Sequence, residues 1–95
     1  MKKKLYISLP ITGKNIEDVK FQADSYKDVF SFKYDVVTPF DICDEPDRPY
    51  SHYMGEDMKV LLECDAVFFA PGFSRSKGCQ LEFAAAKIYG KEIIV

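Results

Sequence analysis

Two carboxylates, Glu82 and Asp57, have sequence surroundings in which nucleophilic or acid–base chemistry is possible. Glu82 is flanked by apolar and small residues in a segment that we expect to be helical over residues 77–89. Asp57 falls within a second expected helix, over residues 51–64, near its buried side. A carboxylate in apolar surroundings has a raised pKa and can serve as a nucleophile or a proton donor. The alternative is structural: Glu82 would stabilise the helix dipole, and Asp57 would be a solvated boundary residue.

Hydrogen-bond donors cluster just before the helix that carries Glu82. Serines, basic side chains and a glycine at a helix start could cradle a phosphate or an oxyanion, because the first backbone N–H groups of a helix lack partners within it. These residues are Ser74, Arg75, Ser76, Lys77 and Gly78.

A second loop, after the first apolar segment, also leads into a helix start. It contains Ser8, Thr12 and Gly13, followed by Asn15 as the expected N-cap. The loop has neither the spacing of a phosphate-binding P-loop nor that of a dinucleotide fingerprint. An anion site and an ordinary strand–turn–helix connection both stay open here.

The elements that must position these residues alternate regularly along the chain. Short apolar runs predict strands, and segments with apolar residues at helical spacing predict helices. Residues 40–50 are predicted to be a loop rich in Asp and Pro, with Ser51 as a candidate N-cap for the helix that follows. Strands are expected over residues 4–9, 34–37, 65–70 and 92–95, and helices over residues 16–33, 51–64 and 77–89.

This β-α-β-α-β-α-β order predicts an α/β fold. We expect one three-layer α/β/α domain over residues 1–95, with a parallel sheet of four or five strands, flavodoxin-like or Rossmann-like and doubly wound. Ligands of such sheets bind beyond the carboxyl ends of the strands. The two donor-rich loops should meet at that edge, which is therefore the expected substrate site.

Composition limits the partners. With 13 basic and 15 acidic residues the net charge is −2, unlike the basic surface typical of nucleic-acid-binding proteins. No apolar run approaches the length that spans a bilayer. The three cysteines have wide spacing that fits neither a disulfide framework nor a zinc motif, which favours free thiols in a cytoplasmic protein. We expect no nucleic acid, membrane or metal among the partners.

Four motifs together resemble those of the nucleoside 2-deoxyribosyltransferase-like proteins. The similarity covers nearly the whole chain and is greatest to a small branch found in bacteria and phages. Its most specific parts are the Gly-x-x-x-Glu element that ends at Glu82 and the Cys-Asp-Ala segment at residues 64–66. The motifs are LYIS-x-PITG at residues 5–13, VVTP at 36–39, D-x-x-x-L-x-x-C-D-A at 57–66 and PG-x-S-x-S-x-G-x-x-x-E-x-x-x-A at 71–86.

The resemblance implies a mechanism. Glu82 matches the family's nucleophile, which attacks C1′ of a deoxynucleoside, expels the base and forms a glycosyl-enzyme ester that a second base or water resolves. Asp57 matches the residue that protonates or positions the base, and Tyr6 matches a tyrosine beside the nucleophile. This chemistry needs no metal and no organic cofactor. The implied substrate is a small nucleoside or nucleotide.

Two departures from the family pattern bear on the substrate. Ser76 stands where the transferases carry an Asp that holds sugar hydroxyls. The similar deoxynucleoside 5′-monophosphate N-glycosidases have a Ser there that contacts the phosphate, which favours a substrate with a 5′-phosphate. Leu9 stands where a Gly is common, and would either narrow the pocket or turn outward. Three interpretations stay open: an N-glycosidase or transferase, a nucleotide-binding module without catalysis, and a structural or regulatory protein with a vestigial pocket.

The resemblance also implies a homodimer or larger homo-oligomer, because relatives assemble in this way. Several aromatic residues, including Phe21 and Phe32, are difficult to bury together in a domain of this size. Such residues would suit a symmetric interface between copies of the chain.

Overall fold

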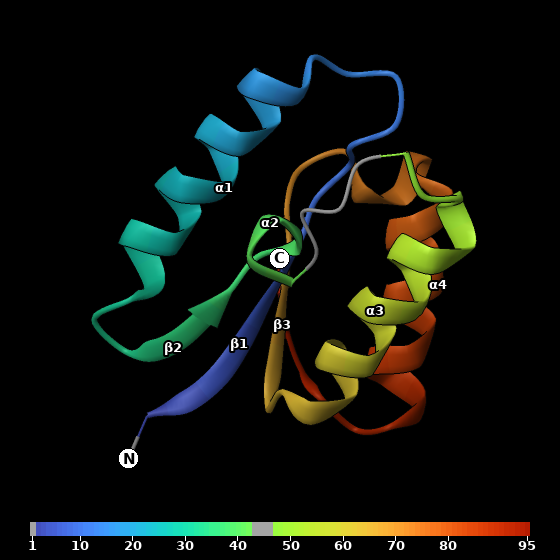
Figure 1. The fold of residues 1–95 in the computed structure, drawn as a ribbon. Helices are drawn as coiled ribbons and strands as arrows, with labels where there is room; N and C mark the ends of the chain where they lie inside the picture. Colours follow the sequence, from blue (N-terminus) through green and yellow to red (C-terminus); the bar gives the residue numbers. More distant parts are fainter. Residues whose placement is uncertain (1, 43–46) are drawn as a thin grey trace.

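A four-stranded, all-parallel sheet in the order β2-β1-β3-β4 forms the centre of the protein (Figure 1). The structure, a computed structural model, describes residues 2–42 and 47–95. The predicted α/β fold with a parallel sheet and helices on both faces is confirmed, with four strands. The elements are β1 (Lys3–Ser8), α1 (Ile16–Phe30), β2 (Tyr34–Val37), α2 (Pro39–Ile42), α3 (Tyr50–Glu63), β3 (Ala66–Phe69), a 3₁₀ turn η1 (Phe73–Arg75), α4 (Lys77–Ile88) and β4 (Glu92–Ile94).

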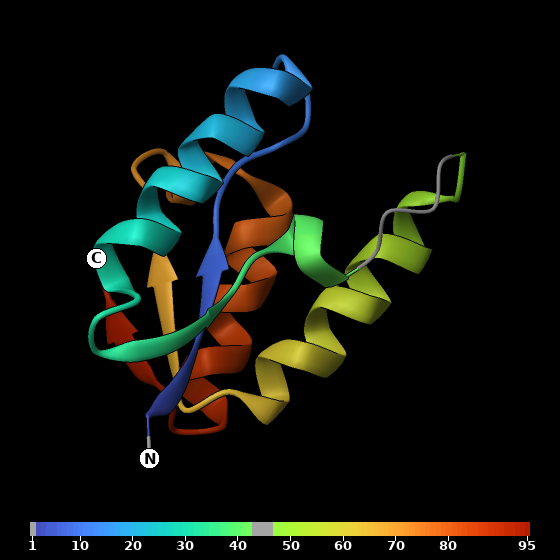
Figure 2. The ribbon, with the colours of Figure 1, turned by 60° about the vertical axis from the view of Figure 1, so that its left-hand side comes forward.

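The helices divide between the two faces of the sheet. In Figures 1 and 2, α1 covers one face, and α3 and α4 lie together on the other. Successive strand residues point to opposite faces. In β1, Leu5 and Ile7 therefore join the core beneath α1, whereas Tyr6 joins the core beneath α3 and α4. Ser8 follows Tyr6 by two positions and shares its face, so β1 directs two hydroxyl groups toward α4.

Helix α1 begins where the sequence predicts and ends earlier than predicted. The Asn15 side chain caps it by accepting hydrogen bonds from the backbone N–H groups of Glu17 and Asp18, at 2.9 and 3.1 Å. The helix ends at Phe30, because the chain turns over residues 31–33 to enter β2. Val29 is exposed, since at 100° per residue it lies well to the side of the stripe that carries the buried Val19 and Ala23.

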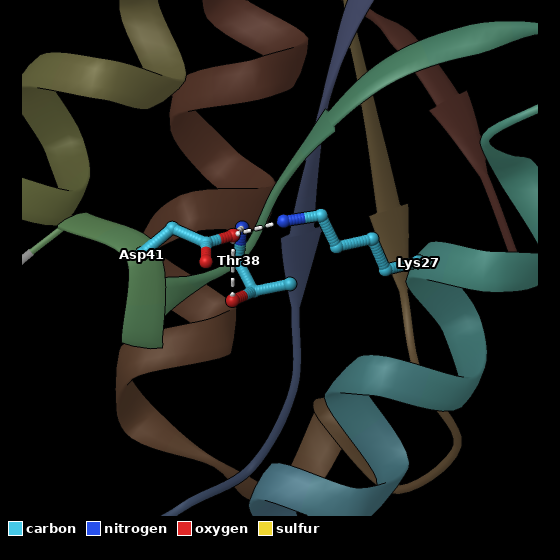
Figure 3. A network of polar contacts seen from close by, with 3 residues as sticks. All are labelled: Lys27, Thr38 and Asp41. Carbon is cyan, nitrogen blue, oxygen red and sulfur yellow. Dashed lines mark hydrogen bonds and ion pairs between the residues drawn. The ribbon is translucent and has the colours of Figure 1, made fainter.

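A hydrogen-bond network ends β2 and starts a helical turn that we did not predict. The backbone N–H and the hydroxyl of Thr38 both donate to Asp41 Oδ2, at 3.0 and 3.1 Å, and the Lys27 ammonium lies 3.0 Å from the same oxygen (Figure 3). Burial raises the pKa of Asp41, but these partners outweigh it and hold the pKa below its ordinary value. The prediction of a loop over residues 40–50 is therefore wrong at its start, where α2 lies.

Helix α3 begins one residue before the predicted start. Pro49 takes the N-cap position with an extended backbone (φ −65°, ψ 155°), and Tyr50 is the first helical residue. Ser51 lies inside the helix, so its predicted role as N-cap is wrong. Near the end of the helix, Leu61 is fully buried, whereas Leu62 is exposed.

At the amino edge of the sheet, away from the predicted site, a side-chain hydrogen bond joins β1 to the residue before β3. Asp65 Oδ2 accepts a hydrogen bond of 2.9 Å from the backbone N–H of Lys4, which gives Asp65 a structural role. No helix in the described part of the chain has the length and apolar composition that crossing a membrane requires.

Candidate active site

Glu82 is a buried carboxylate with two hydroxyl donors. It lies in the second turn of α4, and only 4% of its surface is exposed. Tyr6 Oη donates to Glu82 Oε2 at 2.8 Å, and Ser8 Oγ donates to Oε1 at 2.7 Å. Burial raises the pKa of Glu82, and the hydrogen bonds from Ser8 and Tyr6 oppose that rise. The two donors orient both carboxylate oxygens and favour the ionised form.

The loop before α4 is anchored by aromatic packing and by a helix cap. The ring of Phe73 lies 5.3 Å from that of Phe69 on β3 and 5.4 Å from that of Phe83 on α4, measured between centroids. Ser76 caps α4 by accepting a hydrogen bond of 3.3 Å from the backbone N–H of Cys79. The N–H groups of the first helical residues, Lys77 and Gly78, have no acceptor within the helix and are oriented to receive an anion.

Helix α3 brings Asp57 to the same place. Burial, followed by the charge of Glu82, raises the pKa of Asp57 to about 7, and a hydrogen bond with Tyr6 partly opposes the rise. Burial and the same two carboxylates raise the pKa of Tyr6 well above its ordinary value. The Tyr6 hydroxyl is therefore a neutral donor between two acidic groups. Below pH 7, Asp57 is mainly protonated, while Glu82 has two donors that favour its charge.

An inner cavity of about 140 Å³ joins these groups. Glu82, Asp57 and Tyr6 form its polar wall, and the rest of the lining is mainly apolar or aromatic. Leu9 is buried in the core beneath α1 together with Leu5 and Ile7, and part of it also lines this cavity, so it does not turn outward to solvent. The remaining lining residues are Ile11, Thr12, Pro39, Tyr50, Tyr53, Met54, Ser76, Gly78 and Cys79.

An outer cavity of about 520 Å³ adjoins the inner one and carries positive charge. Both cavities are lined by Thr12, Tyr50, Ser76 and Gly78. The outer cavity adds three basic side chains to these shared residues. It is completed by Pro10, Lys14, Gly72, Arg75 and Lys77.

Gly78 permits the close approach of α3 to α4 at the junction of the cavities. A Cβ atom at this position would lie 2.9 Å from Tyr50 Oη and 3.3 Å from Met54 Sδ. Both distances are tighter than ordinary contacts, so a larger residue would displace the α3 side chains. Tyr50 therefore lies directly over the start of α4, between the acidic and the basic cavity.

The predicted site residues divide into three groups. The first group lines one or both cavities and comprises Glu82, Asp57, Tyr6, Thr12, Ser76, Lys77 and Gly78. Ser8, predicted to bind substrate, is fully buried and donates to Glu82, so the structure makes it a partner of that carboxylate. Gly13 and Ser74 are not among the described residues that line either cavity. Gly13 instead forms a turn at φ +80°, and the Ser74 carbonyl accepts from Gln80.

Several lining residues were not predicted, although the sequence contains a signal for some of them. Tyr50, Tyr53, Met54 and Asp57 are spaced three, one and three residues apart, which places them on one face of α3. A helix that begins at Tyr50 presents these four side chains on the same side. Lys14 could not be found in this way, because its position depends on how the loop after β1 turns.

Thiols and other potential metal ligands are dispersed. Cys64 and Cys79 are buried free thiols, and burial raises the pKa of Cys64 to about 11 and also raises that of Cys79. Cys43 lies outside the described residues. Within residues 2–42 and 47–95, no His, Cys, Asp and Glu side chains are grouped in a way that could hold a metal ion.

Residues 3–95 match the model of the family described as a domain of unknown function, DUF4406. The match spans almost the entire chain, so the protein belongs to this family. The sequence matches no curated protein at a significant level. The family description names no activity, and the resemblance to the nucleoside 2-deoxyribosyltransferases therefore stays a prediction.

Proposed function

We propose that this member of the DUF4406 family cleaves or transfers the N-glycosidic bond of a deoxynucleoside or its 5′-monophosphate, with Glu82 as the nucleophile. The observation that carries the proposal is the buried Glu82 carboxylate, oriented by Tyr6 and Ser8 and sharing a cavity with Asp57. A buried carboxylate is unfavourable for stability unless it is well hydrogen-bonded. Burial raises the pKa of both carboxyl groups, and perturbed carboxyl groups that share one cavity are typical of acid–base and covalent catalysis.

In the proposed reaction an oxygen of Glu82 forms a bond to C1′ of the sugar while the bond from C1′ to the base nitrogen breaks. The electron pair of that bond leaves with the base. The product is a glycosyl-enzyme ester, which water hydrolyses to free deoxyribose or its phosphate, or which a second base converts to a new nucleoside. Tyr6 and Ser8 hold the carboxylate in one orientation, so that little reorganisation is needed before attack.

Asp57 is suited to act as the proton donor to the leaving base. Its pKa of about 7 leaves a substantial protonated fraction near neutral pH, and a protonated base departs as a neutral molecule. After base release, the ionised Asp57 can accept a proton from the attacking water. The same residue would then serve both steps.

The outer cavity supports a substrate that carries a phosphate. Lys14, Arg75 and Lys77 supply positive charge, and the start of α4 supplies backbone N–H groups. Because this cavity adjoins the inner one, a nucleotide could have its sugar beside Glu82 and its 5′-phosphate at the basic side chains. We therefore expect 5′-monophosphates to be better substrates than the corresponding nucleosides.

The test is base release, measured by chromatography and mass spectrometry after incubation with the four deoxynucleosides and their 5′-monophosphates. We expect wild-type protein to release at least one base, and Glu82→Ala and Glu82→Gln to release none above background. Glu63→Gln is the matched control, because Glu63 is an exposed glutamate at the end of α3. No release by the wild type, or equal release by Glu82→Gln, would overturn the proposal.

A nucleotide-binding module without catalysis is the second candidate, and the narrow inner cavity favours it. At about 140 Å³ this cavity is smaller than the roughly 300 to 1,000 Å³ typical of small-molecule sites, and it could admit part of a nucleotide without allowing the geometry of attack. In this case a nucleotide would raise the melting temperature of the protein and be recovered intact. Thermal melts combined with mass spectrometry of the recovered ligand separate the two candidates.

A further inference from the structure

The inner cavity has room for a single six-membered ring. Its volume is about 140 Å³, and an apolar protein cavity of about 150 Å³ holds one benzene molecule. Most of the described residues that line the inner cavity are apolar or aromatic, which suits the faces of a flat ring. A base with a second fused ring exceeds this space unless a wall of the cavity moves.

The walls of the inner cavity are held by contacts outside it. Leu9 packs in the core beneath α1, and Tyr53 Oη accepts a hydrogen bond of 3.2 Å from the backbone N–H of Arg48. Pro39 is the first residue of α2 and directly follows Thr38, whose backbone N–H and hydroxyl are both hydrogen-bonded. Extra volume forced between packed side chains is unfavourable, because their neighbours must shift as well. The size of this cavity can therefore discriminate between ligands.

The order of the groups in a nucleotide assigns the inner cavity to the base. The sugar of a nucleotide lies between its phosphate and its base. With the phosphate at the basic side chains of the outer cavity and C1′ at Glu82, the sugar lies where the two cavities adjoin. The base then continues into the inner cavity, where Asp57, the proposed proton donor, is part of the wall.

We propose that the site selects deoxynucleoside 5′-monophosphates with a one-ring base, the pyrimidines, over those with a purine. This inference rests on the proposed function and specifies its substrate. The fit of a one-ring base and the restraint on the walls together carry it. A purine nucleotide would have to displace a wall residue or leave C1′ too far from Glu82 for attack.

Met54 is the wall residue that can be shortened to test this size limit. Its Sδ atom would lie 3.3 Å from a Cβ atom at position 78, so the side chain extends from α3 to the start of α4. Met54→Ala removes the side chain beyond Cβ and enlarges the cavity. Met58→Ala is the matched control, because Met58 lies one turn later and packs in the core beneath α3 and α4. Met58 is not among the described residues that line the inner cavity.

The first experiment compares kcat/KM for base release from dCMP and dUMP with that from dAMP and dGMP. We expect the wild type to prefer the pyrimidine nucleotides at least about tenfold, since even one surplus methylene in a closed pocket has an effect of about that size. Met54→Ala should reduce the preference at least about fivefold, and Met58→Ala should leave it unchanged. Comparing the same substrates between variants cancels their differences in intrinsic reactivity. Circular dichroism verifies that each variant is folded.

The second experiment measures binding to Glu82→Gln by calorimetry, so that the nucleotides stay intact. We expect dCMP and dUMP to bind at least about tenfold more tightly than dAMP and dGMP, and added Met54→Ala to reduce the difference. If the wild type releases no base while this binding preference holds, the proposed reaction fails and the size limit stands. Purine nucleotides that bind or react as well as pyrimidine nucleotides would overturn the inference. So would a preference that folded Met54→Ala leaves unchanged, or the absence of binding by any of the four.

The comparison of the four nucleotides on Glu82→Gln needs no further substitution. It therefore tests the size limit even if Met54→Ala does not fold.

Discussion

Replacing Tyr6 by Phe removes one of the two hydroxyl donors to Glu82 and leaves the rest of the buried ring in place. The fold offers a matched control in Tyr34→Phe. Tyr34 is also a buried tyrosine whose hydroxyl donates to a glutamate, Glu92, at 2.9 Å, compared with 2.8 Å for Tyr6 and Glu82. The difference lies in the acceptor, because Glu92 is exposed and water can replace the lost donor, whereas Glu82 is buried.

The magnitude follows from the charge of the acceptor. A hydrogen bond to a buried charged group contributes roughly 1.5 to 3 kcal/mol, and one to a neutral group roughly 0.5 to 1.5 kcal/mol. The pKa of Glu82 is higher in the folded protein than in the unfolded chain. The contribution of Glu82 to stability is therefore largest at pH values below its unfolded pKa, and it is lost as pH rises through its folded pKa. Tyr6→Phe raises the folded pKa further. The free energy of unfolding should therefore fall by about 1 kcal/mol more at about pH 8 than at about pH 4.

The assay is urea denaturation at a series of pH values, followed by circular dichroism. Tyr34→Phe should change stability by less than about 0.5 kcal/mol with no dependence on pH, because its acceptor stays solvated. In a Glu82→Gln background, the pH dependence of the Tyr6→Phe effect should disappear. An equal loss for Tyr6→Phe at both pH values, or a pH-dependent loss that persists without the Glu82 carboxylate, would refute the assignment of Tyr6 as the group that stabilises the Glu82 charge.

Three further substitutions test other parts of the site and its support. Gly78→Ala should displace the Tyr50 hydroxyl, because the new Cβ atom would lie 2.9 Å from it. Thermal melts should then show weaker nucleotide binding, and adding Tyr50→Phe should restore the binding. Asp57→Asn should raise the free energy of unfolding by about 1 to 2 kcal/mol at about pH 8 and leave it nearly unchanged at about pH 4, because the raised pKa of Asp57 makes its charge unfavourable only as pH rises. Asp41→Asn should reduce stability by about 1 kcal/mol near neutral pH. The Asp41 effect should shrink at acid pH, since the lowered pKa of Asp41 means that its contribution is lost as pH falls.

The sequence predicted the sheet and its helices because their signals are local. Apolar strands separated by amphipathic helices leave few alternatives for a short chain, and a parallel sheet brings the carboxyl ends of β1 and β3 together. The proximity of Tyr6 to Glu82, in contrast, was expected only from the family resemblance, and their hydrogen bond of 2.8 Å agrees with it. The predicted start of α3 is wrong because serine is a common N-cap residue, which favoured Ser51 for that position. In the structure Pro49 is the N-cap residue, and its ring holds φ at −65°.

The role of Ser8 and the division into two cavities could not be predicted. Whether Ser8 faces a ligand or a neighbouring carboxylate depends on how closely α4 packs on β1, and no local pattern encodes that distance. The same is true of Gly78, whose lack of a side chain lets Tyr50 lie over the start of α4. These contacts join residues more than 20 positions apart and become visible only in three dimensions.

The energetics of Glu82 bear on whether the pocket is structural or functional. Burial raises the pKa of Glu82 and of Asp57, so near neutral pH both carboxyl groups destabilise the fold relative to uncharged residues of similar shape. Tyr6 and Ser8 reduce this penalty for Glu82 but do not remove it, and amides at positions 82 and 57 would avoid it. A purely structural role thus gives no physical reason for two acids in one cavity. A reaction that needs one ionised and one protonated carboxyl group gives such a reason for both, and for the hydroxyl of Tyr6 between them.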